Sequence, residues 1–343
     1  MTTLDLRHML VPFLALSVAC SGGGAKDDTG DTTGDDTDET CSSGLDGFWP
    51  EPNASDVYYR TSIEVMFAQE EDGSSATITL NDGSADVTGT VEWSDDGMTA
   101  YFKPSAPLTP STTYTLSVSY SCGKSATNSF TTSSTGATVD GMSVIDDVYS
   151  IDLFSGRIIE PAGVEDLLQS LLAGQDPIII LVSPTTYDGD ANTIEIRGAL
   201  GKMNGSDIVQ DECTESINFP LPADYSNNPY FTINGVDVPL SVQGISLKID
   251  RLDVSGAFAS DGSSIDGVSV DAFADTRPLA SLGVGDICEL VQIAQVECVP
   301  CADNEPACLK IRVTDLTAEQ VDGLMGLNAI TADDVTNNPT CDE

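Results

Sequence analysis

Residues 187–195, YDGDANTIE, carry oxygen-bearing side chains at nearly alternate positions. Carboxylate and amide oxygens are the ligands that Ca²⁺ prefers, so the segment is a candidate calcium site. The four candidate ligands are Asp188, Asp190, Asn192 and Glu195. The segment lacks the glycine and the final glutamate of an EF-hand loop, which favours the alternative, an ordinary polar hairpin loop. The acidic turn around Asp261 and Asp266 has the same two interpretations, and no other cofactor is expected.

One missing residue type narrows the catalytic chemistry. The only histidine is His8, inside a segment that we interpret below as an export signal. The mature chain would then hold no Ser-His-Asp triad, no histidine zinc ligand and no imidazole acid–base group. Hydrolysis by two carboxylates stays open, but no pair among the 55 acidic residues can be singled out. We therefore expect a protein that is not an enzyme.

Nine cysteines offer further chemistry. Cys20 is assigned to a lipid below, and the even set that remains suits four disulfides in an oxidising compartment. The alternative is a zinc site built from the four cysteines between residues 288 and 308, which include a C-x-x-C pair. Disulfides are the favoured interpretation. The candidates are Cys41, Cys122, Cys213, Cys288, Cys298, Cys301, Cys308 and Cys341.

The first nineteen residues have the pattern of a cleaved export signal. Arg7 lies in a charged start, and the apolar run at residues 9–19 is too short to cross a membrane, which takes about 20 helical residues. The sequence LSVAC at residues 16–20 resembles the lipobox of bacterial lipoproteins. That resemblance implies that Cys20 becomes the first mature residue and receives a diacylglyceryl thioether. The residues from Cys20 to position 45 are acidic and hold little to bury, which predicts a disordered tether.

The charge of the chain restricts its partners. With 55 acidic and 13 basic residues, the formal net charge is −42, so binding to the phosphate backbone of nucleic acid is excluded. The expected partners are a membrane, reached through the N-terminal lipid, and an envelope protein or glycan. The expected location is the outer membrane of a bacterial cell envelope, on its periplasmic or its surface-exposed side.

Residues 46–134 are predicted to form an antiparallel sandwich. Short runs of β-branched and aromatic residues alternate with Gly, Asp, Asn and Pro turns, as in SIEVMF and TYTLSVSY. Ile63, Val65 and Phe67 should face the core and leave their polar neighbours in water. From placement alone, Cys41 and Cys122 are expected to staple the entry to this domain.

This segment is similar to the bacterial Ig-like domain of the S-layer (SbsA) type. The matching elements are an Asp96-Gly97 turn, Phe102 and Pro104, the segment PLTPSTTY at residues 107–114, and a closing FTT at residues 130–132. The resemblance implies a spacer or adhesive module without catalytic residues. Tyr114 is expected to act as a tyrosine corner, which ties one end of a sandwich to its own backbone.

After a small, polar linker at residues 135–141, residues 142–343 are predicted to form one β-rich domain with one or two short helices. PIIILV at residues 177–182 suits a strand buried on both faces. Asn234-Gly235 is a hairpin signal, and a phase shift in residues 244–259 suggests a bulge near Asp250. The domain is expected to be a curved sheet or a barrel, mainly β like the whole chain.

Two helices are expected in this second domain. Residues 161–174, PAGVEDLLQSLLAG, place leucines at helical spacing between a starting proline and a final glycine. A second short helix is expected at residues 317–326, TAEQVDGLMG, with Thr317 as its N-cap.

Three functions remain in view. The leading hypothesis is a non-enzymatic envelope lipoprotein, in which an Ig-like spacer presents a β-rich binding or structural domain. The second is a carrier of an apolar ligand, with PIIILV and the leucine helix lining an enclosed cavity of at least about 300 Å³. The third is a glycan hydrolase with two acids about 5 to 9.5 Å apart in a cleft.

Overall fold

The computed structural model describes residues 44–71, 73, 76–152, 156–161, 179–242, 245–282, 286–292 and 295–341. From residue 41 onward the chain forms one compact unit. The expected signal peptide, Cys20, Cys41 and all but the last two residues of the expected tether lie outside the described residues. The helix expected at 161–174 also lies outside them, apart from Pro161.

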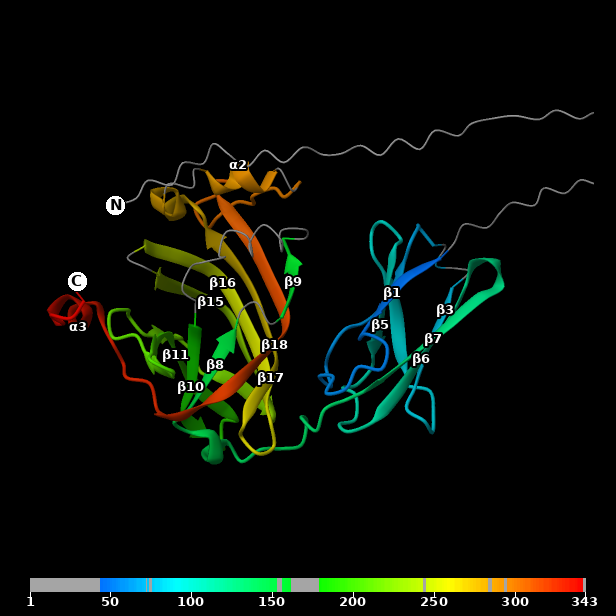
Figure 1. The fold of residues 1–343 in the computed structure, drawn as a ribbon, viewed down its shortest axis with the longest axis horizontal. Helices are drawn as coiled ribbons and strands as arrows, with labels where there is room; N and C mark the ends of the chain where they lie inside the picture. Colours follow the sequence, from blue (N-terminus) through cyan, green and yellow to red (C-terminus); the bar gives the residue numbers. More distant parts are fainter. Residues whose placement is uncertain are drawn as a thin grey trace, which may run out of the picture. The chain divides into compact units, whose positions relative to one another are not determined.

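The first seven strands form two antiparallel sheets (Figure 1). The four-stranded sheet has the order β1-β2-β5-β4, made of Leu45–Trp49, Ile63–Phe67, Thr99–Pro104 and Gly89–Trp93. The three-stranded sheet has the order β3-β6-β7, made of Thr77–Asn81, Thr113–Tyr120 and Lys124–Thr131. A single apolar cluster holds buried residues of both sheets, so the predicted sandwich is confirmed.

Alternation along β2 departs from the prediction at one position. Ile63, Val65 and Phe67 are buried as expected, at 0%, 1% and 2% exposure. Glu64, which should face water, is only 7% exposed. The physical reason is a second packed surface, because the carboxylate of Glu64 meets the guanidinium of Arg157 from the following domain.

The tyrosine corner is present. The backbone N–H of Thr109 donates a hydrogen bond to the hydroxyl oxygen of Tyr114 at 2.8 Å, five residues upstream in the chain. Tyr114 is 2% exposed, and its ring stacks on Phe130 with 5.6 Å between ring centroids. The bond ties the 107–114 segment to the core of the sandwich, as the sequence predicted.

The second domain is one curved antiparallel sheet that closes on itself (Figure 1). The pairing order β10-β8-β18-β17-β16-β15-β14-β11 is completed by a further pairing of β11 with β10. Three strands are not part of this ring: β9 pairs with β18, and β12 and β13 each pair with β11. The strands are β8 Asp147–Asp152, β9 Arg157–Glu160, β10 Ile179–Asp188, β11 Thr193–Asn204, β12 Asp207–Gln210, β13 Ile217–Asn218, β14 Ala223–Asn227, β15 Tyr230–Val242, β16 Ile245–Phe258, β17 Ser264–Asp275 and β18 Cys308–Met325.

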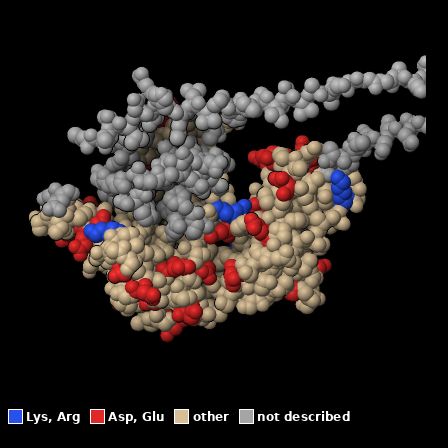
Figure 2. Space-filling model, in the orientation of Figure 1, with Lys and Arg blue, Asp and Glu red and all other residues tan. Residues whose placement is uncertain are grey.

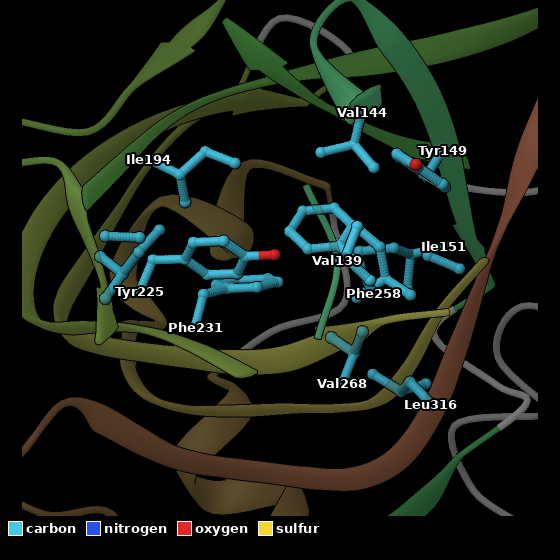
Figure 3. Close-up of a cluster of buried hydrophobic side chains, with 14 of the residues drawn as sticks. Val139, Val144, Tyr149, Ile151, Ile194, Tyr225, Phe231, Phe258, Val268 and Leu316 are labelled. Atoms are coloured by element: carbon cyan, nitrogen blue, oxygen red, sulfur yellow. The ribbon is translucent and has the colours of Figure 1, made fainter. Parts of the chain in front are cut away.

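Side chains fill the inside of this closed sheet. Figure 3 shows Tyr225, Phe231 and Phe258 side by side, between Ile194 and Val144 on one side and Val268 and Leu316 on the other. The Phe258 ring centroid lies 5.3 Å from that of Phe231 and 6.0 Å from that of Tyr225. An eight-stranded closed sheet has an interior just wide enough for such packing.

Two irregular positions lie in the long strands. The bulge predicted near Asp250 is confirmed, because the pairing of β16 with β17 shifts between Asp250 and Asp253. The hairpin predicted at Asn234-Gly235 is wrong, since both residues lie within β15. Gly235 has φ of 63°, and the pairing register shifts around it, so the glycine permits a bulge rather than a turn.

The helix predicted at residues 317–326 is also wrong, because nearly all of this segment continues β18. Ala318 pairs with Ile265 of β17 on one side and with Ile151 of β8 on the other. Two sets of strand hydrogen bonds outweigh the weak helix propensity of a short segment. Short helices occur elsewhere in the described chain, at α2 Ile287–Val291 and α3 Ala332–Asn337.

Three disulfides are described, all in the second domain. They join Cys213 to Cys341, Cys288 to Cys298, and Cys301 to Cys308. The four cysteines considered for zinc are therefore consumed in two disulfides, which overturns the zinc alternative. Cys122 is disulfide-bonded as well, and its partner lies outside the described residues. The pairing of Cys122 with Cys41 stays a prediction.

Candidate functional site

The predicted calcium residues lie around the β10–β11 turn, but they form a polar hairpin. The Asp188 carboxylate accepts hydrogen bonds from the N–H groups of Asp190 and Ala191, at 2.9 and 3.0 Å. Glu195 lies in β11, opposite Thr186. In the part of the chain that the structure describes, no three His, Cys, Asp or Glu side chains are grouped so that they could hold a metal.

The packed interior bears on the apolar-carrier hypothesis. Ile180 and Val182 of the PIIILV segment pack against the filled interior cluster, and Leu181 is fully buried in a smaller cluster. Within the described residues, side chains occupy the space in which an apolar ligand would have to lie. The leucine helix that the hypothesis also requires lies outside these residues.

A pocket of about 640 Å³ lies instead where the Ig-like sandwich meets the closed sheet. This is the size range of small-ligand sites, roughly 300–1,000 Å³. We call it the junction cleft. Its sandwich side consists of residues 49–51, 54–58, 61 and 133–135, and its closed-sheet side of residues 259, 261, 263, 264, 266, 267, 315 and 317.

Polar contacts near the cleft join its two sides. Thr61 donates its hydroxyl to the Asp315 carboxylate at 3.0 Å and accepts from the Trp49 indole N–H at 3.2 Å. Arg157 forms two hydrogen bonds of 3.1 Å with Glu64, and its guanidinium lies 4.1 Å from the centroid of the Trp49 ring. Such bidentate, charge-assisted bonds fix orientation as well as distance.

Close packing also fixes the junction. Tyr58 of the sandwich lies against Gly267 of β17 so closely that a Cβ on the glycine would stand 2.1 Å from the tyrosine ring. Gly267 also has φ of 59°, so both space and backbone conformation require glycine here. Arg60 lies 4.2 Å from the centroid of the Tyr230 ring. These contacts join the two domains by aromatic packing as well as by polar bonds.

Two carboxylates in the β16–β17 turn region line the cleft. Ser263 donates its hydroxyl and its backbone N–H to Asp261, and these hydrogen bonds hold the pKa of Asp261 below its usual value. Asp266 accepts hydrogen bonds from the hydroxyls of Thr135 and Ser264. A glycosidase acid needs a raised pKa, so Asp261 is shifted in the wrong direction for that role.

Tyr58 adds a buried hydroxyl to the junction. No hydrogen-bond partner of this hydroxyl is found in the described structure. Burial, the largest cause, and the neighbouring Tyr59 raise the pKa of Tyr58 far above its usual value. Tyr58 therefore stays protonated and contributes an aromatic wall rather than a charge.

Sequence reasoning found part of this site. It singled out the acidic turn of Asp261 and Asp266, but as a weak calcium candidate. The sandwich side of the cleft carries no motif, because its lining comes from two stretches about 80 residues apart, residues 49–61 and 133–135. Only the folded arrangement brings these stretches to the β16–β17 turn.

Comparison with known proteins identifies the first domain. Residues 44–138 match the family model of the bacterial Ig-like domain, so the sandwich is a bacterial Ig-like domain. No curated protein sequence gives a significant match to the chain. Among the described residues, no helix has the length and apolar character needed to cross a membrane.

Three solved structures are similar to parts of the chain. The copper resistance protein PcoC from Escherichia coli is 20% identical and covers 26% of this chain and 98% of its own, with a TM-score of 0.23. The N-terminal part of the bacterial S-layer protein SbsC is 12% identical and covers 68% and 41%, with a TM-score of 0.24. The L,D-transpeptidase from Mycobacterium smegmatis is 13% identical and covers 62% and 76%, with a TM-score of 0.24. Nothing about the activity of this chain follows from likenesses of this degree.

Proposed function

We propose that this chain is a non-enzymatic lipoprotein of the bacterial cell envelope, anchored in the outer membrane through a lipid on Cys20. Its Ig-like domain acts as a rigid spacer that presents the closed-sheet domain to an envelope protein or a glycan. The Ig-like family match supports an envelope or surface protein. The disulfides support export to an oxidising compartment.

The observation that carries the proposal is the docking of the Ig-like domain on a filled closed sheet. A spacer can orient what it presents only if the junction between them is fixed. Here Arg157 of the closed sheet donates two hydrogen bonds to the Glu64 carboxylate of the sandwich. Tyr58 packs on Gly267, and Ala257 of β16 belongs to the apolar cluster of the sandwich. The segment between the domains is held too, because Asn228 exchanges hydrogen bonds of 2.7 and 2.6 Å with the backbone of Val139.

The anchor is tested by expressing the full chain in a bacterial host that processes lipoproteins and growing the cells with labelled palmitate. We expect label on the wild-type chain and its recovery in the outer-membrane fraction. Cys20→Ser should lose the label and leave the membrane fraction, whereas the neighbouring Ser21→Ala should behave as wild type. A wild-type chain without acyl mass on its first mature peptide would contradict the anchor. Protease treatment of intact cells then distinguishes a surface-exposed from a periplasmic domain.

A further inference from the structure

The junction cleft has an unbalanced charge. Its lining contains five carboxylates and no Lys, Arg or His: the acids are Glu51, Asp56, Asp261, Asp266 and Asp315. Arg157 lies 3.9 Å from Asp315 at the edge of the cleft. In the described structure the other four carboxylates form no ion pair with a basic side chain. In Figure 2, Asp and Glu occupy more of the visible described surface than Lys and Arg do.

The spacing of these acids points to an extended ligand rather than a single ion. No three acidic side chains in the described chain are grouped closely enough to hold one metal. The negative charges are instead distributed along both sides of a volume of about 640 Å³. A ligand that neutralises several of them must itself carry positive charge at more than one place. A neutral ligand would leave the mutual repulsion of the carboxylates unchanged.

The molecule already contains one example of the recognition chemistry. The guanidinium of Arg157 lies on the ring of Trp49 and beside the carboxylates of Glu64 and Asp315. Trp49 and Asp315 both line the cleft. An aromatic face combined with carboxylates is a general arrangement for binding organic cations. Hydroxyls of Thr61, Ser264 and Thr317 lie in the same lining and can accept hydrogen bonds from ammonium or guanidinium groups.

We propose that the junction cleft binds a small oligocation, a ligand that carries two or more ammonium or guanidinium groups, such as a short basic peptide segment or a polyamine. A concave site lined by one sign of charge concentrates its field and attracts the opposite charge. Because its two sides come from different domains, an occupied cleft also holds the Ig-like domain against the closed sheet. This inference goes beyond the proposed envelope role and does not depend on the lipid anchor.

The test is calorimetric titration of the full chain at about 0.15 M salt, where the Debye length is about 8 Å and weak surface attraction is screened. The probes are trilysine, spermidine and trilysine with acetylated amines. We expect saturable binding of one cation per chain and at least a tenfold weaker affinity in the double variant Asp261→Asn, Asp266→Asn. At position 261 the amide oxygen can still accept both hydrogen bonds from Ser263. At position 266 Thr135 and Ser264 donate to different carboxylate oxygens, so the amide oxygen keeps one of these bonds and the amide NH2 can donate to the other hydroxyl. The fold should therefore persist.

The matched control is Asp82→Asn, Asp96→Asn, in two exposed turns of the sandwich. Asp82 accepts hydrogen bonds from the backbone N–H of Ala85 and from Ser84, and Asp96 accepts one from Ser94. These bonds lower the pKa values of both carboxyls, as in Asp261, but both residues lie outside the cleft. The control should bind as wild type. Equal weakening of both double variants, equal binding of acetylated trilysine, or no saturation would overturn the proposal. Preferential binding of trilysine identifies a peptide ligand and preferential binding of spermidine a polyamine, and either result supports the oligocation site.

Discussion

The Ig-like domain and the closed-sheet domain bury their apolar side chains in different ways. The sandwich places a four-stranded sheet against a three-stranded one, and neither sheet closes on itself. The second domain closes a ring of strands by pairing β10 with β11, so its core lies inside a single sheet. In the described residues, buried apolar side chains fill both cores. The cleft with unpaired charge lies where the two domains meet.

The two domains also differ in how the hydroxyl group of a buried tyrosine is bonded. Tyr114 in the sandwich has a hydroxyl that accepts a backbone hydrogen bond from Thr109. Tyr225 inside the closed sheet is 1% exposed, and no partner of its hydroxyl is found in the described structure. Burial raises the pKa of Tyr225, so its hydroxyl stays neutral. One tyrosine fixes a loop, and the other mainly fills space.

The substitution Phe258→Ala tests the packing inside the closed sheet most directly. Phe258 is fully buried among Tyr149, Tyr225 and Phe231. Removal of a ring from such a site should lower the free energy of unfolding by about 4 kcal/mol, measured by chemical denaturation. The control Val91→Ala, at a side chain 37% exposed on β4, should change it by less than about 0.5 kcal/mol. Equal effects would show that the interior is not packed as described.

The junction is tested by Arg157→Met. The side chain of Glu64 is 9% exposed and would keep its negative charge without its partner. Because the side chain of Arg157 is itself 25% exposed, we expect a loss of about 2 kcal/mol, below the range for a fully buried pair. Addition of Glu64→Gln should recover part of this loss. The exposed pair of Lys103 and Glu92 supplies the control, and Lys103→Met should cost less than about 1 kcal/mol. A similar loss of unfolding free energy in Arg157→Met and Lys103→Met would show that the contact between Arg157 and Glu64 stabilises the protein no more than an exposed ion pair does.

In the sandwich, Tyr114→Phe isolates the hydroxyl of the tyrosine corner. The ring and its stacking on Phe130 remain, while the N–H of Thr109 loses its acceptor. We expect the free energy of unfolding to fall by about 1 kcal/mol, measured in the same denaturation experiment. An unchanged value would show that water replaces the lost acceptor and that the corner does not stabilise the domain.

Tyr225→Phe should have the opposite sign or no effect. It removes a buried hydroxyl that has no partner in the described structure, so the free energy of unfolding should stay the same or rise by up to about 1 kcal/mol. A fall comparable to that of Tyr114→Phe would reveal a hydrogen bond to Tyr225 and would remove the contrast between the two domains.

The sequence predicted the sandwich better than the closed sheet for a physical reason. In the sandwich, strands such as β6 and β7 pair across short turns, so alternation and turn residues mark them locally. The ring of the second domain also requires the pairing of β8 with β18, in which Ser150 lies opposite Glu319. No pattern of neighbouring residues in the sequence predicts a pairing over such a separation. The same long-range pairing turned the segment after Thr317 into a strand.

The candidate site was still less accessible to sequence reasoning. Asp261 and Asp266 could be noticed as an acidic turn, but their counterparts on the sandwich side, such as Glu51 and Asp56, are ordinary loop acids by sequence. The burial of Glu64 could not be predicted either. The alternation of residues in a strand indicates which face packs in its own domain, but it does not indicate that a second domain covers the other face. The features of the site that the sequence did not predict lie where the two domains meet.

The central claim is that the Ig-like domain is fixed on the closed sheet, so that a cleft with a definite shape lies between them. Electron spin resonance tests it most directly, with nitroxide labels at exposed Ser119 of β6 and exposed Ser226 of β14, each replaced by cysteine in a Cys20→Ser chain. The account predicts a single narrow distribution of label distances that broadens in Arg157→Met. A broad distribution in the otherwise unaltered chain would contradict a fixed junction.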